Sequence, residues 1–98
     1  MKRLLFDVES DGLLTTATTI HCIVIKDLDT NAGINAFTGG QIDEAIQTLD
    51  SADVLIGHNI IAYDIPLINK ITGVNLLTKK FFKLNSIIDT LTLSRLLD

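Results

Sequence analysis

The chain has 98 residues, 47% of them hydrophobic and 20% charged, which is typical of one small globular domain and not of a disordered segment. Its net charge of −4 argues against a module that holds duplex DNA through a basic face, because phosphate contacts need Lys and Arg. The same charge leaves metal-dependent chemistry open, since carboxylates can hold divalent cations.

The N-terminal segment predicts a strand and not a targeting signal. Residues 1–6 are basic and then apolar, but Asp7 interrupts the apolar run too early for a signal peptide. No apolar run reaches the roughly 18 residues that a membrane span needs. The single cysteine, Cys22, cannot form an internal disulfide. We therefore expect a cytoplasmic protein with no membrane association.

The first half of the chain predicts a three-strand meander followed by a helix. Apolar and β-branched runs at residues 3–8, 20–28 and 34–37 are typical of strands, with turn residues between them. Residues 41–50 then place apolar side chains at helical spacing.

The second half predicts strands that alternate with helices: a strand over 52–57, a helix over 62–72, a strand over 86–88 and a last helix over 91–97. Pro66 is tolerated if it lies in the first helical turn, and Gly73 would end that helix. Asp89 or Thr90 would cap the last helix. The order β-β-β-α-β-α-β-α predicts an α/β fold over residues 1–98, with a central mixed sheet flanked by helices.

Two carboxylates on the first strand are candidates for chemistry. Asp7 and Glu9 are two residues apart, so a strand presents both on one face. Two acids that close repel each other unless a cation lies between them. Because the segment is otherwise apolar, we expect Asp7 at least to be poorly solvated. The alternative is an exposed strand end without chemistry.

A second group of polar residues follows the strand at 52–57. His58, Asn59 and Asp64 lie where this buried strand passes into a helix, the edge at which open α/β sheets bind ligands. Asp64 could instead be a helix N-cap, and His58 and Asn59 could be structural turn residues. Together with Asp7 and Glu9, the group is rich in oxygen ligands, which suits Mg²⁺ or Mn²⁺ better than zinc.

Three segments resemble one family. Residues 6–13 resemble the first motif of the DEDD (DnaQ-like) 3′–5′ exonucleases, residues 58–66 resemble the second motif, and residues 88–97 resemble the segment that follows it. The strongest likeness is to the N-terminal proofreading domain of family A DNA polymerases from lytic phages. The match in order and spacing runs from residue 3 to residue 97.

This resemblance implies a ribonuclease H-like fold and a 3′–5′ exonuclease that hydrolyses the terminal phosphodiester of a single-stranded DNA 3′ end. It implies that two divalent cations, Mg²⁺ or Mn²⁺, are the cofactors. It also implies that the protein acts in the cytoplasm of a phage-infected or bacterial cell. By the same likeness Asp7, Glu9 and Asp64 would be catalytic. Asp7 and Asp64 would bind metal directly, and Glu9 would bind one metal and help align the attacking water.

The resemblance also implies substrate contacts. Gly12 and Leu13 would lie beside the terminal nucleotide, with Leu13 wedged against its base. His58 and Asn59 would shape the same pocket, although a purely structural role in the turn is an equal alternative. Asp89 fits a cap or a supporting contact better than a fourth carboxylate.

The family's third motif is missing from this chain. That motif supplies a fourth carboxylate with a Tyr or His four residues ahead of it, whereas Asp98 is preceded at that spacing by Ser94. We therefore expect a C-terminally incomplete domain, from a truncated or split protein, with weak or absent catalysis in isolation. Its partner would be a polymerase or a chain that carries the missing motif.

Two other functions stay open at this point. One is a non-catalytic module that binds metal or a nucleotide at a decayed site. The other is an interaction protein that forms a homodimer and buries residues 81–82 and the helix at 91–97. The basic run at 79–83 could contact a DNA strand, or it could be a solvated loop.

Overall fold

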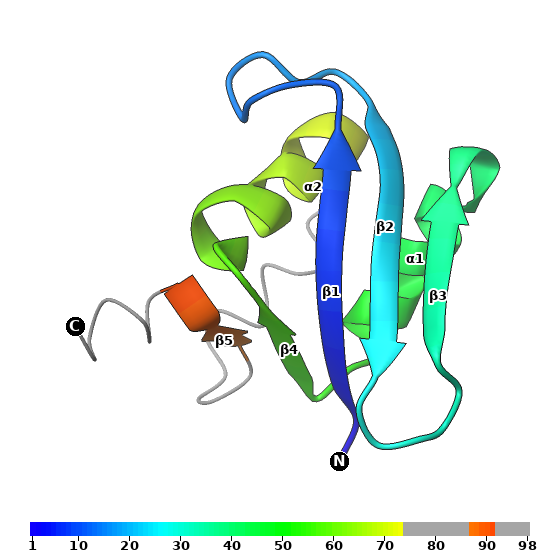
Figure 1. Cartoon of the computed structure of the whole chain (residues 1–98). Helices are drawn as coiled ribbons and strands as arrows, with labels where there is room; N and C mark the ends of the chain where they lie inside the picture. The colour runs from blue at the N-terminus through cyan, green and yellow to red at the C-terminus, as the bar shows by residue number, and fades with distance from the viewer. Residues whose placement is uncertain (74–86, 92–98) are drawn as a thin grey trace.

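The computed structural model describes residues 1–73 and 87–91, and it contains one mixed sheet of five strands (Figure 1). The strands are β1 (Arg3–Ser10), β2 (Ile20–Asp27), β3 (Ile34–Thr38), β4 (Val54–Gly57) and β5 (Ile87–Asp89). The helical elements are the 3₁₀ turn η1 (Gly39–Gln41), α1 (Ile42–Asp50), the π-helical turn η2 (Ile60–Asp64) and α2 (Ile65–Thr72).

The strand order in the sheet is β3-β2-β1-β4-β5. Strands β1, β2 and β3 pair antiparallel, whereas β4 pairs parallel with β1 and β5 parallel with β4. The predicted α/β fold, with a meander followed by parallel strands, is confirmed. The predicted helix over 91–97, the basic run at 79–83, the apolar pair at 81–82, and Ser94 and Asp98 lie outside the described residues, except for Leu91.

Both helices of the described part lie on the same face of the sheet, behind β1, β2 and β3 in Figure 1. The side chains of Leu4, Phe6 and Val8 point from β1 into the core on that face, and each is at most 4% exposed. Burying such a side chain contributes about 1.5–3 kcal/mol. The sequence predicted helices flanking the sheet. Within residues 1–73 and 87–91, helices cover one face of it.

The opposite face, which we call the open face, carries one row of residues across all five strands. The paired registers place in that row Ile34, Lys26, Leu5, Ile56 and Ile88. Leu5 is 39% exposed and Ile34 66% exposed, because no layer within the described ranges covers them. Asp7 and Glu9 belong to the same face, one and two rows further along β1.

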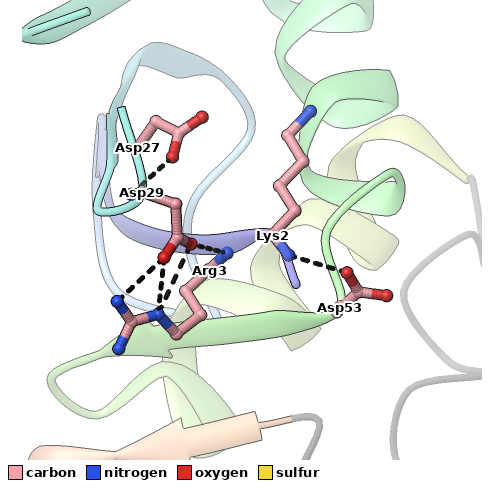
Figure 2. Close-up of polar contacts among 5 residues, drawn as sticks. All are labelled: Lys2, Arg3, Asp27, Asp29 and Asp53. Carbon is pink, nitrogen blue, oxygen red and sulfur yellow. Dashed lines mark hydrogen bonds and ion pairs between the residues drawn. The ribbon is translucent and has the colours of Figure 1, made fainter. Parts of the chain in front are cut away.

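The N-terminal end of β1 is tied to both of its neighbours, as Figure 2 shows. The backbone N–H of Lys2 donates to Asp53 Oδ2 at 2.7 Å, and that of Arg3 donates to Asp29 Oδ2 at 2.7 Å. The Arg3 guanidinium also pairs with Asp29 at 2.8 Å, and Asp27 Oδ1 accepts the N–H of Asp29. The ion pair is exposed, so solvent screens it and it contributes little to stability. The bonds set the register of β1, and therefore the position of the acids at its other end.

Candidate functional site

Strand β1 presents Asp7 and Glu9 side by side, as the sequence predicts. The burial pattern alternates along the strand, and both acids lie on its exposed face. A hydrogen bond from Glu9 to Asp7, together with the negative charge of Asp7, raises the pKa of Glu9. The expectation that Asp7 is poorly solvated is wrong, because Asp7 belongs to the open face and is exposed.

Strand β4 leaves the sheet before β1 ends. The β1–β4 pairing runs only from Arg3 to Leu5 on β1, and β4 stops at Gly57. A Cβ at Gly57 would lie 2.9 Å from the carbonyl oxygen of Phe6 and would collide with Ile60. Glycine therefore lets the backbone turn away close to β1, and no other described strand pairs with the next part of that edge of β1.

Asp64 occupies this gap with its side chain. Its Oδ2 accepts the backbone N–H of Val8 at 2.9 Å, in the place where a longer β4 would have supplied a carbonyl. Asp64 is 3% exposed. The N-cap interpretation of Asp64 is wrong, since the residue is in the right-handed helical conformation and makes no side-chain capping bond to α2. Its carboxyl instead joins η2 to β1 between the positions of Asp7 and Glu9.

The electrostatics show that these acids are crowded. Burial raises the pKa of Asp64 to about 7, despite the bond from Val8 that lowers it, and the charges of Asp7 and Asp89 raise it further. Within the described ranges the ion pair between Arg3 and Asp29 lies elsewhere, and no Lys or Arg pairs with Asp64, Asp7 or Glu9. Among the residues that the structure describes, the end of β1 therefore concentrates negative charge with no Lys or Arg paired to it.

These carboxyls are not arranged as a ready metal cage. Among residues 1–73 and 87–91, no three side chains of His, Cys, Asp or Glu have the arrangement of a metal site. The reason is visible in their bonds, because Asp64 is turned to Val8 while Glu9 and Asp7 contact each other. The chemistry of the set still fits a hard divalent cation, which prefers several carboxylate oxygens. These side chains would have to rotate before they could bind the same cation.

Asp89 organises the turn between β4 and η2. Its carboxylate is 6% exposed and accepts the backbone N–H groups of Asn59 at 2.8 Å, Ile61 at 3.0 Å and Leu91 at 3.0 Å. Asn59 has a left-handed backbone conformation with φ 62°, which residues other than glycine rarely adopt. The bonds from Asn59 and Ile61 hold that turn, and the bond from Leu91 holds the backbone just after β5, so the structural interpretation of Asp89 is confirmed.

His58 lies at the C-terminal end of β4 and has both a structural contact and a place beside Asp7. Its Nδ1 is 2.9 Å from Thr90 Oγ1, which connects the turn to β5. His58 and Asp7 also line a hollow of about 350 Å³, together with Leu5, Phe6, Val24, Lys26 and Ile34. The contact with Thr90 carries no signal in the sequence, because the two residues meet only when β5 pairs with β4.

Gly12 and Leu13 lie in the loop after β1. The carbonyl of Gly12 accepts the hydroxyl of Tyr63 at 2.9 Å, which ties the loop to η2 one residue before Asp64. Leu13 is 72% exposed. The structure therefore places this loop beside the element that carries Asp64. Sequence reasoning did not assign Tyr63 a part in the site, although its position next to Asp64 was a signal.

Two phage proteins are similar to almost the whole chain. The DNA-directed DNA polymerase of Escherichia phage T7 is 30% identical over 94 residues, which are 93% of this chain and 13% of that polymerase. The DNA-directed DNA polymerase of Enterobacteria phage T3 is 29% identical over 98 residues, 96% of this chain and 14% of that polymerase. The chain is distantly similar to a region of DNA polymerases. It spans about one seventh of the length of these relatives.

The fold has a counterpart in a solved structure. The family B DNA polymerase from the hyperthermophilic archaeon Pyrobaculum calidifontis matches 78% of this chain with a TM-score of 0.57 and 21% identity, over 12% of its own length. This likeness concerns the fold alone. No family model matches the chain. No helix in the described part is long and apolar enough to cross a membrane.

Proposed function

We propose that this chain belongs to a metal-dependent 3′–5′ exonuclease domain in a DNA polymerase-like protein, with a ribonuclease H-like fold. Its substrate would be a single-stranded DNA 3′ end, from which it would remove terminal nucleotides. The similarity to phage DNA polymerases supports an association with DNA. The distant α/β counterpart in another polymerase is compatible with it.

The observation that carries the proposal is the insertion of the Asp64 carboxyl into the edge of β1. It brings an acid 56 residues away in sequence to the backbone of Val8, beside Asp7 and Glu9. A buried carboxylate beside like charges raises the free energy of the site unless a proton or a cation neutralises it. Without a cation, a proton neutralises Asp64, as its raised pKa of about 7 reflects. A bound divalent cation would neutralise the carboxylates in place of the proton.

Asp7, Glu9 and Asp64 are the residues that would hold such cations. Two bound Mg²⁺ or Mn²⁺ ions would activate water and stabilise the leaving oxygen of a phosphodiester. Ionised Glu9 would accept a hydrogen bond from water at the site and so orient it. Leu13, exposed on the loop, offers an apolar surface to the terminal base, and His58 and Asn59 would border the same space.

Metal binding tests the first part of this proposal. We expect Mn²⁺ to bind the chain at pH 8 in calorimetry and to bind less tightly at pH 6, where the proton on Asp64 competes. Asp7→Asn and Asp64→Asn should each weaken binding by about tenfold or more. The matched control is Asp43→Asn, an exposed acid in the first turn of α1, which should leave binding unchanged. Equal Mn²⁺ affinity in all four proteins would refute the metal site.

Cleavage tests the second part. With Mn²⁺ and a candidate partner that carries a Tyr- or His-x-x-x-Asp helix, a strand labelled at its 5′ end should shorten one nucleotide at a time, and Asp7→Ala should abolish this. The chain alone should cleave weakly or not at all. Metal binding without cleavage under both conditions would favour the non-catalytic binding module instead.

A further inference from the structure

The loop that follows β1 is held by a small network of hydroxyl groups. Tyr63 OH lies 2.9 Å from the carbonyl oxygen of Gly12 and 2.8 Å from Ser10 Oγ. Ser10 Oγ is also 2.8 Å from the same carbonyl and accepts the N–H of Gly12 at 3.3 Å. Each hydroxyl has one proton to donate, so either both donate to the Gly12 carbonyl, or one donates to it while the other donates to its fellow hydroxyl.

The two hydroxyls differ in what they connect. Ser10 is the last residue of β1, and its bonds to Gly12 stay within the loop. Tyr63 belongs to η2, so its hydroxyl joins the loop to the element that carries Asp64. The ring of Tyr63 packs against the core, which gives the hydroxyl a rigid support. Within the described residues, this is the side-chain bond that joins η2 to residues 11–13.

The far side of the loop is held separately. The carboxylate of Asp11 accepts the backbone N–H groups of Thr18 and Thr19 at 2.9 and 3.0 Å and the hydroxyl of Thr18 at 2.7 Å. The backbone N–H of Ala17 donates to the carbonyl of Leu13 at 2.7 Å. With both sides held, Leu13 stands 72% exposed at the loop. An exposed leucine on a fixed backbone makes a defined apolar contact instead of a mobile one.

We propose that Tyr63 is a positioning residue, whose hydroxyl holds the Gly12–Leu13 loop against η2 so that Leu13 meets the terminal nucleotide at a defined place beside the carboxylates. This inference rests on the proposed exonuclease function for its ligand, a single-stranded DNA end. A π-helical turn such as η2 is rare and is often found at functional sites. Tyr63 and Asp64 are consecutive residues of η2. The side chain of Tyr63 bonds to the loop, and that of Asp64 bonds to β1.

The first measurement concerns the loop alone. In Tyr63→Phe the ring stays and only the hydroxyl's bonds to Gly12 and Ser10 are lost, so the methyl groups of Leu13 should show a clearly lower NMR order parameter. The matched control is Ser10→Ala, in which the Tyr63 hydroxyl still donates to Gly12 and Leu13 should remain ordered. Unchanged order of Leu13 in Tyr63→Phe would overturn the proposal.

The second measurement concerns the DNA end. Wild-type protein with Mn²⁺ should bind linear oligothymidylate more tightly than a circular one of equal length, which has no end. Tyr63→Phe should lower this preference about fivefold, the loss expected for one net hydrogen bond, while affinity for the circle stays the same. An undiminished preference in Tyr63→Phe would overturn the positioning role, even if Leu13 has become mobile.

A third variant keeps the test decisive if Tyr63→Phe does not fold. Leu13→Ala removes an exposed side chain and leaves the tie from Tyr63 to Gly12 in place, and it should lose the same preference for the linear strand. Retained preference in Leu13→Ala would overturn the proposal. If the wild-type protein binds neither the linear nor the circular strand, both the proposed function and the role of Tyr63 are overturned. If only Ser10→Ala loses the preference for the linear strand, the role of Tyr63 alone is overturned.

Discussion

The buried carboxyl of Asp64 should make the stability of the fold depend on pH in an unusual direction. Its pKa is raised from 3.8 to about 7 in the folded chain, so the folded state holds the proton more tightly than the unfolded one. The resulting stabilisation is complete below pH 3.8 and is lost as the pH rises through 7. Between pH 5 and pH 8 the free energy of unfolding falls over about 2 pH units, from pH 5 to about 7, and then levels off. At about 1.36 kcal/mol per unit this is a decrease of about 3 kcal/mol.

Asp64→Asn should remove this dependence. The amide oxygen can still accept the N–H of Val8, but the side chain no longer ionises. Urea unfolding followed by circular dichroism in EDTA should show the variant gaining about 3 kcal/mol relative to wild type between pH 5 and pH 8.

Asp50→Asn, at the exposed C-terminal end of α1, is the matched control and should follow the wild-type curve. Added Mn²⁺ should restore wild-type stability at pH 8, because a ligand that binds only the folded state stabilises it. Parallel pH curves for wild type and Asp64→Asn would refute the argument that this carboxyl is buried and charged at high pH.

Three further predictions concern the framework around the acids. Gly57→Ala should cost about 1–3 kcal/mol in urea unfolding, since its Cβ would lie 2.9 Å from a backbone oxygen of β1, whereas Gly40→Ala, which meets nothing within 4 Å, should be nearly neutral. Asp89→Ala should cost about 3 kcal/mol or more in the same assay, because three backbone N–H groups lose their acceptor, and a loss below 1 kcal/mol would contradict that role. A double-mutant cycle with Arg3→Met and Asp29→Asn should give a small coupling energy that decreases in high salt, because the pair is exposed; a large coupling that does not change with salt would contradict this.

Local patterns in the sequence determined most of the secondary structure. Alternating and apolar runs predicted β1, β2 and β3, and helical spacing predicted α1, because each pattern reflects contacts within one element. The left-handed conformation of Gly73 ends α2 as expected, and Pro66 lies in its first turn. The sequence missed the π-helical turn η2 (Ile60–Asp64), because the predicted helix over 62–72 included only its last three residues. Nothing in the local spacing distinguishes the two.

The sequence also determined that Asp7 and Glu9 share a face, since the two-residue period of a strand requires it. Whether that face is covered is a property of the packing, and for this reason Asp7 proved exposed against expectation. The acid that is buried is Asp64, and its position depends on where β4 stops beside β1. Strand pairing between distant segments, which no local pattern encodes, decided which carboxyl meets which backbone.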